Sequence, residues 1–224
     1  MSNPEAQREK LASYRDPKLV ARYDERWRGL RGPGRDRRKQ RAILRALATL
    51  PKVESVLDVP CGTGRFSGFL PALGLRYLGG DASPAMLTEA RRKYPAVHFA
   101  ALDLAHLPMP DRSVDLVVCI RLMHLVRDAQ LRAAFLREMA RVARVGVVVD
   151  FRQRSSLRAW LGSARHRLGL RAKAPGALTH EQIRAELEAA GLDVTAIVPV
   201  RRPAWIGDKV VFAARTKPAP RTAR

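Results

Sequence analysis

Short apolar runs alternate with helix-like patterns along most of the chain, which is typical of a mainly parallel sheet covered on both faces. Residues 129–143 carry apolar side chains at helical spacing, which predicts an amphipathic helix. The apolar runs that predict strands lie at residues 56–58, 76–81, 96–101, 113–120, 144–151, 192–200 and 209–214.

Cap residues mark two of the helix ends. Ser83 and Pro84 have the residue types of an N-cap and a first helical turn. Thr179 and Gln182 have the spacing of a capping box, and Gly191 is placed to end the helix that this box opens.

The first apolar run ends in Asp58 and leads into a glycine turn and an amphipathic segment, which predicts a strand, a tight turn and a helix around a nucleotide-like ligand. Gly62 and Gly64 can take positive φ and let a ligand approach the backbone. Ser67 stands where a dinucleotide motif has its third glycine, and no Gly-Lys-Ser/Thr follows, which excludes a P-loop. A carboxylate at the strand end suits a cationic ligand better than a pyrophosphate. A purely structural corner is the alternative.

Acids also follow the second and third predicted strands. Asp81 closes the run 76–81, and at this spacing after the turn a carboxylate can accept both hydroxyls of a ribose. Asp103 follows the run 96–101. A single acid after a strand is usually a cap or turn residue, but the ordered series favours a ligand site.

These residues resemble the first motif of the class I S-adenosylmethionine-dependent methyltransferases, acid-x-Gly-x-Gly-x-Gly. Pro60 replaces the first glycine, so that corner must need neither positive φ nor an N–H donor. The resemblance implies an α/β, Rossmann-like, doubly wound sheet of seven mainly parallel strands with an antiparallel edge strand and helices on both faces. It also implies S-adenosylmethionine as cofactor, S-adenosylhomocysteine as product, and recognition of the adenine amino group near Asp103. The cofactor-binding residues expected on this basis are Asp58, Pro60, Cys61, Gly62, Gly64, Asp81, Ala82, Asp103, Leu104 and Cys119.

In such enzymes the protein mainly aligns the reactants, because the methyl group on a sulfonium is already activated. An acceptor hydroxyl would benefit from a base, and His124, after the fourth strand, is the candidate. The alternative is a packed histidine at the start of the next helix. Arg121 could hold a substrate carboxylate or phosphate, or point to solvent. Tyr14 and Tyr23 are candidate lid residues, and Tyr23 is also a substrate candidate.

The charge is strongly positive, with 42 Lys and Arg against 21 Asp and Glu, a net +21. Basic residues crowd the first 45 positions and recur after Asp150, with no acid before Glu181. In the family these two regions commonly cover the cofactor and form the substrate pocket, so an anionic acceptor, or one embedded in an anionic membrane, is expected. Trp160 and Leu161 suit an interfacial helix. A merely solvated basic face is the alternative.

The length predicts one α/β domain. We divide the chain into a basic helical extension or lid (1–45), a cofactor-binding domain (46–215) with a basic substrate cap (152–180), and a disordered basic tail (216–224). No apolar window reaches the roughly 20 residues of a membrane span, and the N-terminus does not resemble a signal peptide. We therefore expect a cytoplasmic protein with peripheral contact to the inner membrane surface. Neither a disulfide nor a metal site is expected, because Cys61 and Cys119 sit at predicted strand ends rather than in a C-x-x-C pair and the five histidines lack metal-ligand spacing.

Three functions fit these features. The first is a methyltransferase that acts at oxygen or nitrogen on a small, anionic or lipid-linked acceptor. The second is an RNA methyltransferase, which the charge favours, although residues 119–122 lack the Asn/Asp-Pro-Pro-aromatic signature of amino-methylating nucleic-acid enzymes. The third is a non-catalytic, cofactor-binding regulatory module, against which the retained acids Asp58, Asp81 and Asp103 count.

Overall fold

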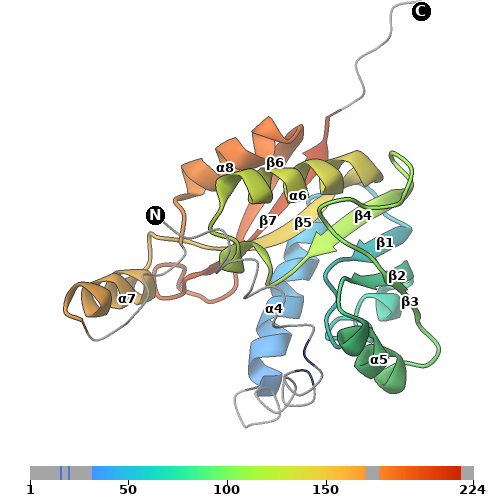
Figure 1. Ribbon diagram of the computed structural model, residues 1–224. Helices are drawn as coiled ribbons and strands as arrows, with labels where there is room; N and C mark the ends of the chain where they lie inside the picture. Colours follow the sequence, from blue (N-terminus) through green and yellow to red (C-terminus); the bar gives the residue numbers. More distant parts are fainter. Residues whose placement is uncertain (1–15, 17–19, 21–31, 170–176, 218–224) are drawn as a thin grey trace, which may run out of the picture.

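A computed structural model describes residues 16, 20, 32–169 and 177–217. Seven strands form one sheet in the order β3-β2-β1-β4-β5-β7-β6, with helices on both faces (Figure 1). The strands are β1 (Ser55–Asp58), β2 (Arg76–Asp81), β3 (His98–Ala101), β4 (Val114–Cys119), β5 (Ala143–Arg152), β6 (Leu192–Pro199) and β7 (Lys209–Thr216). The helices are α4 (Gly32–Leu47), α5 (Pro84–Lys93), α6 (Ala129–Val142), α7 (Leu157–Arg167) and α8 (His180–Ala189), with short 3-10 helices η2 (Pro71–Leu73) and η3 (Met123–Leu125).

The strand order reverses between β1 and β4, which are parallel neighbours. In open α/β sheets, ligands bind at the carboxyl ends of the strands beside such a switch point. The predicted Rossmann-like sheet and its antiparallel pair are confirmed, with one refinement. β7 runs antiparallel to both β5 and β6 and lies one place inside the edge, which β6 occupies. The burial explains this order, because five successive residues of β7 are buried whereas most residues of β6 are partly or fully exposed.

Each face of the sheet has its own hydrophobic cluster. α6 and α8 cover one face, where Met139 and Leu187 pack with Val147 and Phe212. α4 packs on the other face, where its Ile43 contacts the cluster that contains Val148. All six residues of β4 are buried, as expected for a central strand covered on both sides.

The predicted helix caps are confirmed. The Ser83 hydroxyl accepts a hydrogen bond from the Met86 N–H at 3.3 Å, and Pro84 is the first residue of α5. Thr179 and Gln182 form the predicted capping box at the start of α8, which ends before Gly191 (φ +84°).

The helix predicted directly after the glycine turn is wrong. This segment forms turns that lead into η2. Gly68 lies so close to Tyr94 that a Cβ at this glycine would be 3.0 Å from the ring, and Pro71 supplies no N–H. Gly74 then takes a φ of +81°, which ends η2. Two glycines and a proline within seven residues therefore stop a longer helix from forming.

The predicted domain limits fall inside regular structure, and those of the cap, residues 152 and 180, lie at the last residue of β5 and the first of α8. The limit between residues 45 and 46 lies within α4, where Ala42, Ile43 and Ala46 are all buried. The predicted tail begins inside β7, because Thr216 pairs with Leu192 and its hydroxyl donates to the Arg144 carbonyl at 2.8 Å. The remaining tail, residues 218–224, and nearly all of 1–31, including Tyr14 and Tyr23, lie outside the described residues. Among the helices that are described, none is both long and apolar enough to cross a bilayer.

Candidate active site

The glycine turn that follows β1 has open space beside Gly62. Gly62 and Gly64 have φ values of +57° and +79°, a conformation that favours glycine. A Cβ added at Gly62 would have no atom within 4 Å, whereas one at Gly64 would lie 3.0 Å from the Tyr94 ring. Gly64 therefore serves packing, and Gly62 faces a space that a ligand can enter.

Asp81, at the end of β2, ties the glycine turn to the start of α5. One carboxylate oxygen accepts the Gly62 N–H at 2.8 Å and the other accepts the Ser83 N–H at 2.9 Å. Burial raises the pKa of the Asp81 carboxyl, and these two hydrogen bonds oppose the rise. Each oxygen retains a second lone pair, so the carboxylate can still accept two ligand hydroxyls.

Asp58, at the end of β1, carries a buried oxygen without a partner. The Tyr77 hydroxyl donates to its Oδ2 at 2.9 Å, while Oδ1 has no hydrogen bond to any described residue. Burial raises the pKa of the Asp58 carboxyl to about 7; the Tyr77 hydrogen bond opposes the rise, and the charge of Asp81 adds to it. Leaving a buried acceptor unpaired is costly, so a ligand that brings a donor or a positive charge would be stabilised at this oxygen.

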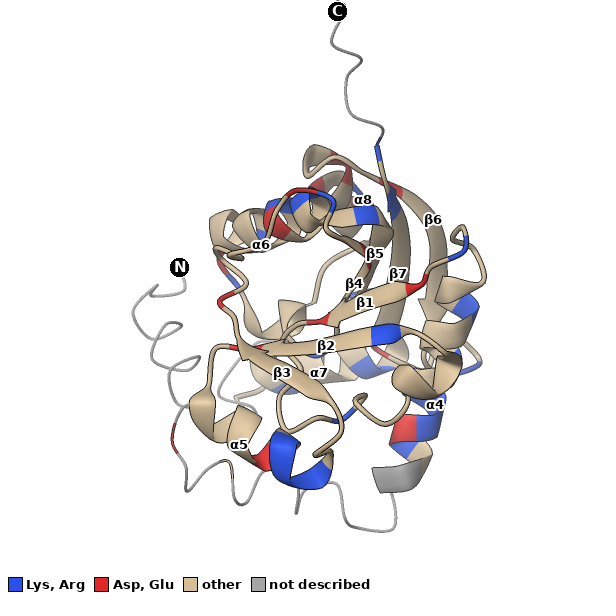
Figure 2. Ribbon diagram, turned by 90° about the vertical axis from the view of Figure 1, so that its right-hand side faces the viewer, with Lys and Arg blue, Asp and Glu red and all other residues tan. Residues whose placement is uncertain are grey.

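Parallel pairing brings most of the other predicted cofactor residues to the same edge (Figure 2). Cys119 ends β4 and is fully buried. The Cys61 N–H donates to the Gly80 carbonyl at 2.8 Å, and Pro60 follows a cis peptide bond. Both cysteines are free, as expected, and burial raises the pKa of both thiols, so they act here as small packing residues.

The loop after β3 is tied to the end of β2. The Leu102 N–H donates to the Asp81 carbonyl at 3.1 Å, and Leu104 is buried. The exposed Asp103 carboxylate accepts the Ala105 N–H at 2.9 Å, as in an Asx turn. Ala82, between the two anchored residues of the β2–α5 turn, is exposed. The structure thus places Ala82, Asp103 and Leu104 in loops that adjoin the end of β2.

A second polar group lies at the ends of β4 and β5, around the buried Asp150. Its carboxylate accepts one hydrogen bond from Lys39 Nζ, on α4, and another from the Arg121 backbone N–H, both at 2.5 Å. Arg121 has a φ of +74°, which is unusual for a residue with a side chain, and the bond to Asp150 holds this conformation. Burial raises the pKa of Asp150, but the charges of Lys39 and His124 and the two hydrogen bonds outweigh it and hold the pKa at about 2.

His124 lies in η3, beside this group. Burial lowers the pKa of its imidazole to about 4; Asp150 opposes the shift, and the cations Arg152, Lys209 and Lys39 add to it. The ring is therefore neutral near pH 7 and has one nitrogen free of a proton. Sequence reasoning missed Asp150 and Lys209 as site residues. The one available signal was an acid inside the apolar strand 147–151.

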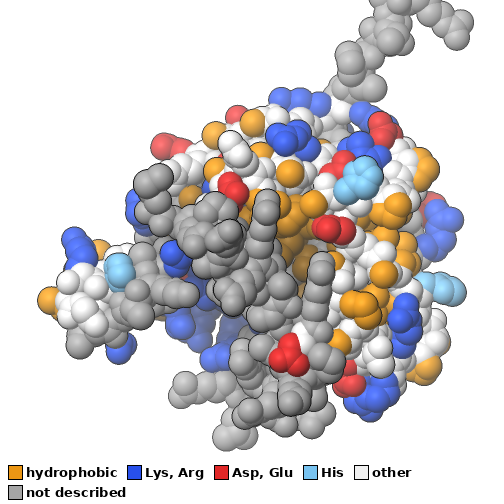
Figure 3. Space-filling model, viewed as in Figure 1, with side chains coloured by type: hydrophobic (Ala, Val, Ile, Leu, Met, Phe, Trp, Pro, Cys, Tyr) orange, Lys and Arg blue, Asp and Glu red, His pale blue; other side chains and the backbone are white. Residues whose placement is uncertain are grey.

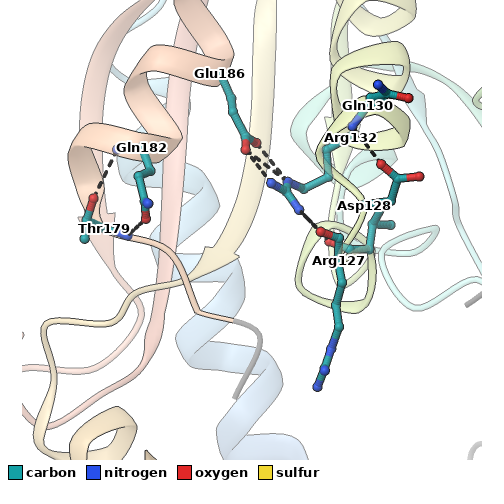
Figure 4. A network of polar contacts seen from close by, with 8 residues as sticks. Arg127, Asp128, Gln130, Arg132, Thr179, Gln182 and Glu186 are labelled. Atoms are coloured by element: carbon teal, nitrogen blue, oxygen red, sulfur yellow. Dashed lines mark hydrogen bonds and ion pairs between the residues drawn. The ribbon is translucent and has the colours of Figure 1, made fainter. Parts of the chain in front are cut away.

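A pocket opens next to His124. Arg132, one of its lining residues, forms hydrogen bonds to a side chain of α8 and to backbone carbonyls (Figure 4). It binds Glu186 at 2.5 Å and 2.9 Å and donates to the carbonyls of Val126 and Arg127. Arg152 Nε, in contrast, has no hydrogen bond to a described residue, and its nearest acid, Asp208, is 3.7 Å away. The residues that line the pocket are Met123, His124, Val126, Arg127, Arg132, Phe151, Arg152, Ala177 and Leu178.

The sequence is similar to known methyltransferases over the sheet's first half. The family model described as a methyltransferase domain matches residues 56–146. A malonyl-[acyl-carrier protein] O-methyltransferase of Yersinia pestis is 38% identical over 96 residues, 43% of this chain and 35% of that protein. A demethylmenaquinone methyltransferase of Beutenbergia cavernae is 38% identical over 121 residues, 53% of this chain and 49% of that protein. The chain thus spans between about a third and a half of these relatives.

Solved structures share the whole fold. Magnesium protoporphyrin IX methyltransferase from Synechocystis PCC 6803, with bound S-adenosylhomocysteine, superposes with a TM-score of 0.69 at 19% identity, covering 94% of this chain and 100% of that one. A S-adenosylmethionine-dependent methyltransferase from Clostridium acetobutylicum gives 0.67 at 15% identity, covering 90% and 98%. At these identities the structural similarity shows the fold alone, and evidence for the family comes from the sequence matches. Residues 56–146 therefore match the methyltransferase domain family, and the chain as a whole has the fold of solved S-adenosylmethionine-dependent methyltransferases.

Proposed function

We propose that this protein transfers a methyl group from S-adenosylmethionine to an oxygen or nitrogen atom of a small acceptor that carries an anionic group. One observation carries the proposal: two sites of opposite charge adjoin at one edge of the sheet. Buried carboxylates end β1 and β2, while arginines and a neutral histidine line the pocket at the ends of β4 and β5. β1 and β4 are direct neighbours, so the two sites are adjacent.

The first site fits the cofactor residue by residue. Asp81 would accept the ribose hydroxyls with its remaining lone pairs. Asp58, whose Oδ1 lacks a partner, would accept the cofactor's amino group, and the bare backbone at Gly62 admits close contact. The loop with Asp103 and Leu104 would border the adenine. When bound, S-adenosylmethionine supplies a methyl group that is already activated on a sulfonium sulfur.

The second site fits an anionic acceptor. Arg127 and Arg152 bring positive charge to a pocket whose lining includes Met123 and Phe151, so an acceptor with an apolar body and an acidic group is favoured. The neutral His124 would accept any proton that the acceptor atom loses as it takes the methyl group and the carbon–sulfur bond breaks, with the electron pair staying on sulfur, and would then release that proton to solvent. With a pKa of about 4, His124 is a weak base. Acceptors such as a carboxylate, which need little deprotonation, suit it better than an unactivated alcohol.

The cofactor half of the proposal is tested by calorimetric titration with S-adenosylmethionine and S-adenosylhomocysteine. We expect micromolar binding of both, and a loss of about 100-fold or more for Asp81→Ala, because two hydrogen bonds to the ribose and the anchor of the turn are lost together. Asp193→Ala is the matched control, because Asp193 is 61% exposed on the edge strand. Unchanged affinity in Asp81→Ala would overturn the ribose assignment.

The acceptor half is tested separately, by transfer of labelled methyl groups to a panel of carboxylates, phenols and amines. His124→Gln should lower kcat by about 100-fold for acceptors that carry a proton and far less for carboxylates. Arg152→Gln should raise KM for anionic acceptors and leave binding of S-adenosylhomocysteine unchanged. Equal rates for neutral and anionic acceptors would contradict the anionic assignment and leave the cofactor site standing.

A further inference from the structure

Helix α7 stands away from the body of the molecule (Figure 1). Ala159 is the one buried residue of the helix. The helix is held at its start, where the Leu157 N–H donates to the Trp205 carbonyl at 2.7 Å. Trp205 belongs to the β6–β7 loop, so α7 and this loop form one continuous surface. We call α7 with Leu168 and residues 201–206 the α7 surface.

The α7 surface exposes large hydrophobic side chains in a helical stripe. Leu157, Trp160, Leu161 and Leu168 are spaced at i, i+3, i+4 and i+11, which places them along one side of the helix. The Trp160 and Leu168 side chains are 59% and 73% exposed, and Trp205 is 60% exposed. Of the seven large hydrophobic residues exposed in the described chain, five lie here. Such a concentration on a folded protein marks an interaction surface.

The net charge around this stripe is positive. No acid occurs in residues 151–180 or 200–207, and Asp208 forms a long ion pair of 3.5 Å with Arg158 at the foot of the helix. Figure 3 shows the Lys and Arg side chains around the projecting helix. The exposed arginines of the α7 surface and its approach are Arg154, Arg158, Arg165, Arg167, Arg201 and Arg202.

We propose that the α7 surface docks on an anionic lipid bilayer, with the helix lying in the plane of the interface. Leu157, Trp160 and Leu161 would enter the boundary between headgroups and acyl chains, and the arginines would meet anionic headgroups. Indole rings favour this depth, because they combine an apolar body with a polar N–H.

The chemistry of the surface favours a bilayer over two other occupants. RNA would pair with the arginines but would leave the leucines without a role, because phosphate binding needs no aliphatic stripe. A second copy of the chain would bring six arginines against six, and like charges oppose such a face-to-face contact.

The α7 surface is also tied to the proposed acceptor pocket. Gln153 follows β5 directly, and its Nε2 donates to the carbonyls of Ala204 and Gly207 at 3.0 Å and 2.7 Å. Its neighbours Phe151 and Arg152 line the pocket. Docking would therefore hold the pocket close to the headgroups, where a lipid-linked acceptor would be within reach. The docking itself does not depend on methyl transfer.

The test is co-sedimentation of the full chain with vesicles of phosphatidylcholine alone or with 30% phosphatidylglycerol, at low and high salt. We expect binding to the anionic vesicles and loss at high salt. Trp160→Ser with Leu161→Ser should weaken binding by about 10-fold. Changing Arg158, Arg165 and Arg167 to Gln should weaken it by about 100-fold at low salt.

Matched controls separate these effects from general loss of charge or apolar surface. Leu44 and Leu73 are exposed elsewhere on the protein, so their Ser variants should bind vesicles like the wild type. Arg76, Arg137 and Arg184 are also exposed elsewhere, so their Gln variants should bind vesicles like the wild type too. Titration with S-adenosylhomocysteine confirms that each variant is folded. The proposal is overturned if the α7 variants bind vesicles normally or if neutral vesicles bind equally well. It is also overturned if the α7 changes abolish RNA retention or dimerisation while vesicle binding persists.

Discussion

The two proposed sites lie at one edge of the sheet, an acidic half at the ends of β1 and β2 and a basic half at the ends of β4 and β5. The two halves differ in charge and in how far apart in sequence their contacting residues lie. At the ends of β1 and β2 the site is acidic, and its key hydrogen bonds, Tyr77 to Asp58 and Gly62 to Asp81, each join residues 19 apart. At the ends of β4 and β5 cations dominate, and the bond from Lys39 to Asp150 joins residues 111 apart.

This difference gives each proposed ligand its own place. A cationic cofactor is attracted to Asp58 and Asp81 and repelled by Arg127 and Arg152, while an anionic acceptor experiences the reverse. If the proposed function holds, opposite fields on adjacent strands would orient the two reactants without a contact to the reacting atoms. The two halves also depend on different contacts for stability. The acidic half is held by hydrogen bonds between residues close in sequence, and the basic half by an ion pair between residues far apart in sequence.

The largest expected effect comes from breaking that ion pair. Lys39→Ala leaves the buried Asp150 carboxylate without its cation and is expected to destabilise the protein by about 3–5 kcal/mol, measured by urea unfolding. Lys52→Ala removes a pair whose side chains are 85% and 62% exposed, so its expected effect is below about 0.5 kcal/mol.

A second variant distinguishes the charge from the packing. Changing Lys39 to Met and Asp150 to Leu together should recover much of the lost stability, because both buried charges are then removed. A loss of under about 1 kcal/mol in Lys39→Ala would show that the pair is not what holds α4 to β5.

The acidic half could be predicted from the sequence, because its determinants are local. The strand ends, the glycine turn and the start of α5 each follow from neighbouring residue types, such as the β-branched run before Asp58 or Ser83 before Pro84. The exception was the helix expected after the turn, where Gly68 and Pro71 outweighed an amphipathic pattern.

The basic half could not be predicted in the same way. Nothing near Lys39 in the sequence indicates that it reaches Asp150, since only the packing of α4 on β5 brings them together. The left-handed conformation of Arg121 cannot be predicted from its neighbours in the sequence either, because it accompanies the hydrogen bond to the distant Asp150. His124 was found from its place after the fourth strand, but its lowered pKa depends on cations from three other elements.

A pH-dependent effect on stability is expected at Asp58. Its pKa is raised from 3.8 to about 7, so between these values the folded chain keeps a proton that the unfolded chain has lost. This contribution to stability is full below pH 4 and is lost as the pH rises to 7. Asp58→Asn should therefore gain stability relative to the wild type over this range, measured by urea unfolding at successive pH values.

The same proton controls the proposed cofactor contact. Below pH 7 the wild-type affinity for S-adenosylmethionine should fall by up to about 10-fold per pH unit, as Asp58 loses its charge, whereas the affinity of Asp58→Asn should be low and nearly flat. Asp81 is present in both proteins, so the difference between the two profiles reports Asp58 together with its charge coupling to Asp81. Parallel pH profiles for the two proteins would remove Asp58 from the site.

The smallest expected change in stability distinguishes a glycine that faces ligand from one that only shapes a turn. Gly62 and Gly74 have φ values of +57° and +81°, and a Cβ at either would have no atom within 4 Å. Gly62→Ala and Gly74→Ala should each cost about 1 kcal/mol of stability, because alanine is strained at positive φ. Only Gly62→Ala places a methyl group in the proposed cofactor space, so it alone should weaken S-adenosylhomocysteine binding by about 10-fold or more in calorimetry. Equal affinities in the two variants would mean that the turn shapes the backbone without contacting the ligand, and the acidic half would then rest on its carboxylates.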